Sequence, residues 1–296
     1  MISYFAFIKN ISRKGTNTTM KVGVFTSLAP NIDEKIAKVK ELGLDNCQLS
    51  CWNIQYMTDE YVEKTTAALK KYGVTVTALW CGWCAPVVWD FYDGHLTLGL
   101  VPREYRHARM NILLNGAEFA RKLGITDVIT HVGFMPENPS SAEYQEIIAC
   151  LRHICKILKS HDQYFLFETG QETPVTLLRT IEDIGTGNVG INLDPANLLM
   201  YGKGNPVDAL LVFGKYVRGI HGKDGVYPTD GQHLGKEKPM GEGLVNYPLF
   251  IKRLHEIGYD GSITIEREIR GEKQIEDILA AKAILEKLFD ENGCRS

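Results

Sequence analysis

Short apolar segments alternate with longer amphipathic segments along most of this chain. The short segments place apolar residues at every second position, which is typical of buried strands. The longer segments repeat apolar residues at the three- and four-residue spacing of a helix. The pattern predicts eight strands, at residues 21–26, 46–50, 74–81, 127–131, 164–168, 188–194, 217–221 and 262–266.

Helical patterns fall between the strands, for example at residues 101–123, 141–160, 247–257 and 275–288. Pro102 stands near the start of the first helix and Gly124 just past its end, as expected for a helix. Eight strand–helix units predict an α/β fold, a closed (β/α)8 TIM barrel in a single domain. A doubly wound open sheet is the alternative, but FTSLAPN after the first strand is not its glycine-rich phosphate loop.

The first residues of the chain do not follow this pattern. MISYFAFIKNISRKGTNTT has a short apolar start and then basic and polar residues, the reverse of the charge order in a secretory signal. We expect residues 1–19 to be a disordered extension or a mis-assigned start, residues 20–290 to form the barrel and residues 291–296 to be a C-terminal tail. Deleting residues 1–19 should leave folding and activity intact, and loss of either would refute this expectation.

Composition narrows the range of partners. With 296 residues and 44% apolar residues the chain can bury the core of a barrel. The 33 basic and 36 acidic residues give a net charge of −3, without a dense basic cluster, so we expect no nucleic-acid partner. No apolar run approaches the ~20 residues of a membrane span, so we expect no membrane partner.

The cysteines do not form the pattern of a disulfide framework. Their number is odd and they are scattered: Cys47, Cys51, Cys81, Cys84, Cys150, Cys155 and Cys294. Reduced thiols and a cytoplasmic location follow from this. The C-x-x-C pair at Cys81 and Cys84 comes after a strand and before a long loop, so we expect plain thiols in that place.

Ionisable residues stand at the ends of five predicted strands. They are His131, Glu168, Asp194, His221 and Glu266. Since side chains alternate along a strand, Phe165 and Phe167 point away from Glu168. We expect the large apolar groups to face the helices and the ionisable groups to face the barrel axis, at the C-terminal mouth where barrel active sites lie.

The last four of these strands are neighbours in a barrel and lie about 4.8 Å apart, so their terminal side chains can meet at one point. Three carboxylates and one imidazole form a ligand set for a divalent cation. The many oxygen ligands favour Mn²⁺ or Mg²⁺ over a structural Zn²⁺ site. Alternatively each residue caps a turn or pairs with a Lys or Arg, but four consecutive strands ending in this way favour the metal.

Five motifs then suggest a family. In chain order they are LFETGQETP, GINLDPANLL, GIHGKDG, PMGEGLVNYPLFIKRL and SITIERE. Together they resemble the motif series of the xylose isomerase-like TIM-barrel superfamily, which contains sugar phosphate isomerases and epimerases, and the resemblance covers about residues 20–288. It implies that Glu168, Asp194, His221 and Glu266 bind one metal ion, with His131 as a nearby polar or catalytic residue.

The resemblance also implies a reaction. Chelation of a sugar carbonyl and its neighbouring hydroxyl by a metal ion stabilises an enediolate, and proton transfer at the adjacent carbon needs an acid and a base. Glu168 and Glu266 would take these roles in a divalent-metal-dependent sugar isomerase or epimerase. The alternative is a lyase or dehydratase acting on a keto-sugar, an inosose or a 3-oxo-glycoside. A carbohydrate-binding barrel without catalysis would not require both acids.

Two departures from the superfamily's subgroups stand out. Asn197 occupies the place where ketose 3-epimerases have a substrate-binding His, and Lys223 is the nearest basic group after strand seven, where an Arg is usual. Trp80 and Asn197 also replace two of the zinc-binding His residues of the endonuclease IV group. These departures weaken a close identity with either subgroup.

The expected site is completed by candidate substrate-binding residues and a cofactor. The candidates are Lys223, Asn197, Trp80, Trp83 and Glu242. The expected cofactor is one divalent ion, Mn²⁺ first and Mg²⁺, Co²⁺ or Zn²⁺ as alternatives. The expected partner is a small-molecule sugar or keto-sugar. A homo-oligomer is a further possibility, by analogy with the family.

Overall fold

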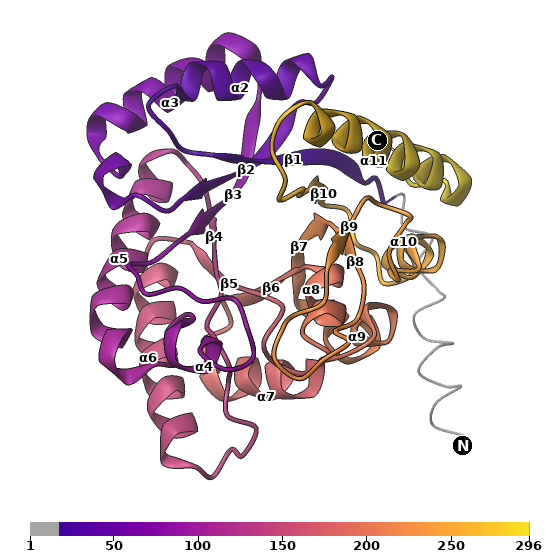
Figure 1. Ribbon diagram of the computed structural model, residues 1–296. Coiled ribbons are helices and arrows are strands. Elements are labelled where there is room, and N and C mark those ends of the chain that lie inside the picture. The colour runs from indigo at the N-terminus through magenta and orange to yellow at the C-terminus, as the bar shows by residue number, and fades with distance from the viewer. Residues whose placement is uncertain (1–17, 296) are drawn as a thin grey trace.

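A computed structural model describes residues 18–295. Its centre is a closed barrel of eight parallel strands in the order β1-β10-β7-β6-β5-β4-β3-β2, which confirms the predicted TIM barrel (Figure 1). The strands are β1 (Lys21–Ser27), β2 (Asn46–Cys51), β3 (Thr75–Cys81), β4 (Asp127–Thr130), β5 (Tyr164–Glu168), β6 (Val189–Leu193), β7 (Val217–Gly222) and β10 (Ser262–Ile265). A short antiparallel pair, β8 (Asp224–Gly225) and β9 (Glu237–Lys238), lies in the loop after β7.

Helices surround the barrel. They are α2 (Ile32–Glu41), α3 (Asp59–Tyr72), α4 (Gly94–Thr97), α5 (Arg103–Lys122), α6 (Ala142–Lys159), α7 (Pro174–Ile184), α8 (Pro195–Met200), α9 (Pro206–Phe213), α10 (Tyr247–Glu256) and α11 (Glu272–Asn292), with 3-10 turns at Ile54–Tyr56 and Gly214–Tyr216. The helix predicted from residue 101 begins only at Arg103, because Pro102 is its N-cap and has an extended backbone. Ser141, predicted as a helical residue, is instead the N-cap of α6, where its hydroxyl accepts the Tyr144 N–H.

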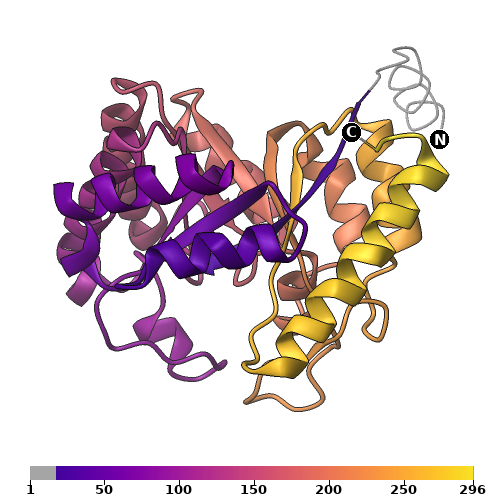
Figure 2. The same ribbon diagram turned by 90° about the horizontal axis from the view of Figure 1, so that it is seen from above.

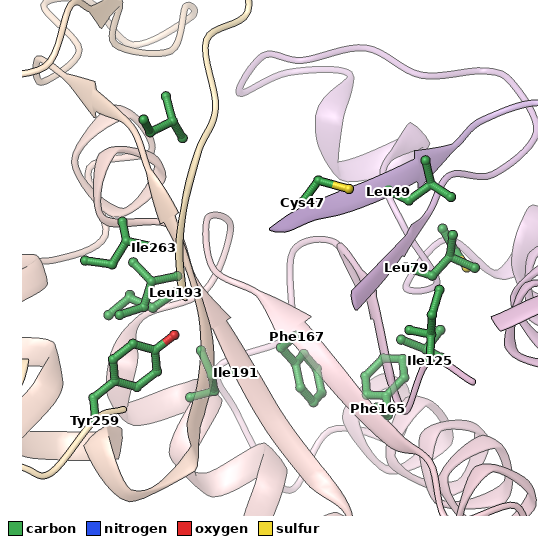
Figure 3. Packing of buried hydrophobic residues seen from close by; sticks show 14 of the residues in the cluster. Cys47, Leu49, Leu79, Ile125, Phe165, Phe167, Ile191, Leu193, Tyr259 and Ile263 are labelled. Carbon is green, nitrogen blue, oxygen red and sulfur yellow. The ribbon is translucent and has the colours of Figure 1, made fainter. Parts of the chain in front are cut away.

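The apolar core lies between the barrel and the helices (Figure 3). Phe165 and Phe167 on β5 belong to it and pack edge to face at 5.0 Å, while Leu166 belongs to a second cluster with Ala78 of β3 and Ile129 of β4. Burying each aromatic ring contributes a few kcal/mol, about 1.5–3. The alternation along β5 therefore fixes Glu168 on the inner face, as the sequence predicts.

The loops at the C-terminal ends of the strands form the mouth. Figure 2 shows the loop with α4 (purple) and the loop with β8 and β9 (orange) projecting from the same end of the barrel. The backbone N–H of Phe91 in the first loop donates to Gln232 O in the second, at 3.0 Å. His131, Asp194 and Glu266 follow the last residues of β4, β6 and β10, so each of these three strands ends one residue earlier than predicted.

The two ends of the described chain meet at the start of β1, at the end of the barrel opposite the mouth. The backbone N–H of Met20 donates to Cys294 O at 2.7 Å, and both residues are buried. Helix α11 continues to Asn292, so residues 291 and 292, expected in a tail, are helical. The expectation for residues 1–17 lies outside the described residues. Within residues 18–295, the helices are too short or too polar to cross a membrane.

Candidate metal centre

Four strand-end side chains converge inside the mouth of the barrel. Glu168, Asp194, His221 and Glu266 each offer a ligand atom, and these atoms lie within 4.8 Å of one another. His221 Nδ1 lies 2.9 Å from Glu168 Oε1, 3.7 Å from Asp194 Oδ2 and 3.1 Å from Glu266 Oε2. They come from β5, β6, β7 and β10, which are consecutive in the barrel, and only Glu266 is more than slightly exposed.

Asp194 has two separate contacts, one for each carboxylate oxygen. Its Oδ1 accepts the backbone N–H of Asn197 at 2.9 Å, which caps helix α8, and Pro195 at the first helical position has no N–H to satisfy. The Thr169 hydroxyl is hydrogen-bonded to the Asp194 backbone N–H and carbonyl. Oδ2 remains directed at the cluster, so the acid both ends the strand and supplies a ligand atom.

A hydrogen-bond chain inside the barrel orients His221. Its Nε2 lies 2.8 Å from Gln48 Oε1, and the Gln48 amide in turn donates to Asn192 Oδ1 at 2.9 Å. An amide oxygen can only accept, so Nε2 carries a proton, and Nδ1 is the ring nitrogen that faces the cluster and can bind a metal ion when His221 is neutral. Gln48 was not a sequence-predicted site residue. A signal was available in the sequence, since Gln48 is a polar residue between Cys47 and Leu49 in the short strand β2, all of which is buried.

Replacing Gln48 by leucine is expected to weaken Mn²⁺ binding by about 10–100-fold, because the imidazole loses the partner that fixes its orientation and protonation. Calorimetric titration of the purified variant measures the change. Gln55→Leu, at an exposed position in the turn after β2, is the matched control and should bind Mn²⁺ like the unaltered chain. An unchanged affinity for Mn²⁺ in Gln48→Leu would show that the hydrogen bond from His221 to Gln48 does not support metal binding.

Lys223 is the cation of the cluster. Its ammonium group is buried and lies 3.7 Å from Asp194 Oδ2, 3.3 Å from Glu266 Oε2 and 2.9 Å from Glu268 Oε1. Burial would lower the pKa of Lys223, but Glu266 and the other carboxylates raise it well above its ordinary value. Lys223 lines the cavity described below. The carboxylates therefore hold Lys223 in its charged form, and its hydrogen bonds are made to protein groups.

The charges of the cluster shift the pKa values of its members in opposite directions. Burial raises the pKa of Asp194 above its usual range. Burial acts in the same sense on Glu266, but Lys223 and His221 outweigh it and hold its pKa below the usual range. Burial opposes protonation of His221, yet Glu266 and Glu168 raise its pKa well above the usual value. The cluster thus attracts positive charge strongly.

The residues present fit a divalent cation. His221 Nδ1 and Asp194 Oδ2 are fully buried polar atoms without a hydrogen-bond partner in the structure. Unsatisfied buried polar atoms are rare in folded proteins, and here both face the same point. Glu168, Asp194 and Glu266 carry more negative charge than the single Lys223 ammonium group balances, and a divalent ion would supply the missing positive charge. The ligand set is rich in oxygen, as Mn²⁺ and Mg²⁺ prefer.

A cavity of about 920 Å³ opens above the cluster and continues into a groove between α2 and α11. Six of the predicted substrate or catalytic residues line it, namely Glu168, Glu266, His131, Asn197, Trp80 and Lys223. His131 Nε2 lies 3.4 Å from Glu168 Oε2, and the Trp80 indole N–H donates to the same oxygen. Trp80 is thus fixed by a carboxylate of the cluster.

Two predicted substrate-binding residues lie elsewhere. Trp83 is buried behind the cavity wall, where its ring is 5.9 Å from that of Trp80, and it is not among the lining residues. Glu242 is exposed in the loop before α10 and does not line the cavity. Sequence reasoning instead missed Trp52 and Trp89, which do line it. Both stand in loops, where no periodicity marks the direction of a side chain.

Arg109 on α5 holds the loop between β3 and α5 in place. Its guanidinium group is buried and donates to four backbone carbonyl oxygens at 2.7–3.1 Å, those of Cys84, Pro86, Thr97 and Gly99. The guanidinium carbon also lies 5.7 Å from the centre of the Trp83 ring. One side chain therefore fixes both halves of the loop that carries Trp89.

Arg109→Met is expected to lower the free energy of unfolding by about 3 kcal/mol, since it leaves several buried carbonyl groups without a donor. Urea denaturation followed by tryptophan fluorescence measures the loss. Arg121→Met on the same helix removes only an exposed ion pair with Glu118 and should cost about 0–1 kcal/mol. Equal effects of the two substitutions would contradict the role assigned to Arg109.

The fold agrees with the family comparison. The family model described as xylose isomerase-like TIM barrel matches residues 36–288, so the chain belongs to this family. The crystal structure of a xylose isomerase domain protein from Planctomyces limnophilus is 33% identical with a TM-score of 0.88, and the match covers 92% of this chain and 98% of that one.

Two further relatives have more specific descriptions. The 3-dehydroshikimate dehydratase of Bacillus anthracis is 29% identical over 141 residues, which is 42% of this chain and 50% of that protein. A D-tagatose 3-epimerase-like protein is 24% identical with a TM-score of 0.69, over 92% of this chain and 98% of that chain, and shows the shared fold. The relatives of this chain therefore include enzymes.

Proposed function

We propose that this chain is a divalent-metal-dependent isomerase or epimerase of a ketose or keto-sugar. The observation that carries the proposal is the convergence of Glu168, Asp194, His221 and Glu266, with two buried ligand atoms unpartnered at the centre. The proposed ion is Mn²⁺, held by these four residues. When bound, it polarises a substrate carbonyl and acidifies the neighbouring C–H bond.

Glu168 and Glu266 are the proposed acid and base. They come from β5 and β10, the outer members of the four consecutive strands, so they flank the point above Asp194 and His221. One carboxylate removes the proton from the carbon next to the carbonyl, giving an enediolate, and the other returns a proton. The carboxylate that removes the proton must be ionised, and the one that returns a proton must first take it from solvent. Lys223 and His221 keep the pKa of Glu266 low, so Glu266 is ionised in the free chain.

His131 and Lys223 support this proton transfer. His131 lies beside Glu168, and its Nδ1 is buried without a partner, so it can bond a substrate oxygen. Lys223 keeps Glu266 ionised by its charge. Asn197 lines the cavity close to the Asp194 cap and is a proposed contact for a sugar hydroxyl.

A substrate screen in D₂O tests the proposal. Ketoses, keto-inositols and 3-oxo-glycosides are incubated with the Mn²⁺-loaded chain and followed by NMR and mass spectrometry. Proton exchange without loss of atoms is the expected result, seen as one deuteron at the carbon beside the carbonyl. A chain that binds Mn²⁺ yet exchanges no proton in any of these compounds would contradict the proposal.

A lyase or dehydratase is the second candidate, favoured by the 29% identity with the 3-dehydroshikimate dehydratase. The same proton abstraction then leads to loss of a group β to the carbonyl. The screen distinguishes the two reactions, because elimination lowers the mass by a water or an aglycone and gives a product that absorbs in the ultraviolet.

A cytoplasmic location and a homo-oligomer complete the proposal. All seven cysteines are free thiols, which supports a reducing compartment. The oligomer is proposed by analogy with the family, and light scattering of the purified chain measures it.

A further inference from the structure

All four tryptophans of the chain gather on one side of the mouth. The ring of Trp83 lies at the centre, 5.2 Å from that of Trp52, 5.9 Å from that of Trp80 and 6.0 Å from that of Trp89. Trp52 follows β2, Trp80 lies on β3, and the other two lie in the loop that carries α4 (Figure 1). They form a continuous aromatic wall, which we call the tryptophan wall.

The four side chains differ in exposure. Trp80 and Trp83 are buried, whereas Trp52 is 45% and Trp89 42% exposed. Both exposed rings line the cavity above the metal cluster. Large aromatic surface that stays exposed in a cavity commonly marks a binding site for an apolar or planar group. Neither ring supports the cluster directly. Within residues 18–295, neither Trp52 nor Trp89 forms a hydrogen bond with Glu168, Asp194, His221 or Glu266.

Both exposed rings are held in place. Trp52 packs directly on the backbone of Gly82, where a Cβ atom would lie 2.5 Å from the ring, so only glycine permits this approach. Trp89 lies in the loop that Arg109 fixes through four carbonyl groups. A rigid aromatic surface loses little conformational entropy when it binds a ligand, which is the property of a recognition platform.

The wall begins next to the reacting centre. The ring of Trp89 lies 5.4 Å from the ring of His131, and His131 Nε2 lies 3.4 Å from Glu168 Oε2. A sugar bound at the cluster therefore has Trp89 at its outer edge, and Trp52 lies further along the wall. The cavity of about 920 Å³ is at the upper end of the ~300–1,000 Å³ that hold drug-sized ligands, although part of it lies in the groove between α2 and α11.

We propose that Trp52 and Trp89 bind the second ring of a two-ring substrate, so that the substrate is a glycoside whose sugar reacts at the cluster. The inference rests on the proposed function, because it takes the sugar to lie at Glu168 and Glu266. The flat indole faces stack on the aglycone or on the second sugar. A free monosaccharide would leave both rings without a contact.

Two probes that differ only in the aglycone test this inference, namely the phenyl and methyl glycosides of 3-oxo-β-D-glucopyranose. Calorimetry with the Mn²⁺-loaded full chain should show about ten-fold tighter binding of the phenyl compound. Trp52→Ala and Trp89→Ala should each bring the ratio of the two affinities close to one, and Trp52→Phe should keep part of the preference. Tyr92→Ala is the matched control, since Tyr92 is exposed in the same loop but does not line the cavity.

Three outcomes would overturn the inference. The first is that the unaltered chain binds the two probes equally, or does not bind the phenyl compound. The second is that the ratio of the two affinities stays unchanged in both alanine variants. The third is that the oligomeric mass changes in those variants while the ratio of affinities does not. The last result would identify the wall as a contact between copies of the chain. Absence of deuterium exchange in the unaltered chain would refute the proposed function, and the affinity ratio would still be measured independently.

Discussion

Glu168→Gln is expected to reduce deuterium exchange into the substrate by about 10²–10⁴-fold, since an amide cannot accept the proton that the carboxylate removes. Glutamine has nearly the shape of glutamate and still accepts the Trp80 N–H, so the barrel should fold as before. The measurement is the initial rate of exchange by NMR at saturating Mn²⁺.

The control for this substitution is Glu276→Gln, which changes an exposed carboxylate on α11. It should exchange deuterium at the rate of the unaltered chain. Near-normal exchange in Glu168→Gln, with substrate and metal bound, would discard Glu168 as the base. If Glu168→Gln loses both exchange and its fold, as seen by circular dichroism, the exchange rate of Glu266→Gln tests the proton transfer instead.

Lys223→Met is expected to lower the free energy of unfolding of the metal-free chain by about 3–5 kcal/mol. The substitution leaves Asp194 and Glu266 buried without the ammonium group that lies within 3.7 Å of both. A bound divalent ion supplies the missing positive charge, so Mn²⁺ should raise the midpoint of thermal unfolding more in this variant than in the unaltered chain.

Lys273→Met, which removes an exposed cation beside Asp277, is the matched control and should cost about 0–1 kcal/mol. If Lys223 served mainly to bind substrate, Lys223→Met would behave differently. KM would then rise with little change in stability, and Mn²⁺ would raise the unfolding midpoint equally in both proteins.

The barrel and the convergence of the four strand-end side chains could be predicted from the sequence because both depend on regular geometry. Alternation along β5 determines that Glu168 faces inward when Phe165 and Phe167 face the helices. Parallel neighbours in a closed barrel then bring the ends of β5, β6, β7 and β10 together without further information.

The rest of the site depends on loops and on contacts between distant residues. Trp52 and Trp89 line the cavity because Gly82 and Arg109 fix the backbone around them, and no local pattern shows such support. Glu242 was expected at the site from its glycine-flanked motif, but the N–H groups of Gly241, Gly243 and Val245 donate to Asp224 and hold that loop with Glu242 exposed.

Calorimetric titration with Mn²⁺ measures whether Glu168, Asp194, His221 and Glu266 bind one divalent ion. Mg²⁺, Co²⁺ and Zn²⁺ are titrated in parallel. One ion per chain is the expected result, with binding lost when Asp194 and His221 are both replaced by alanine in a variant that still folds. Absence of binding by all four ions, or equal binding in that variant, would contradict it.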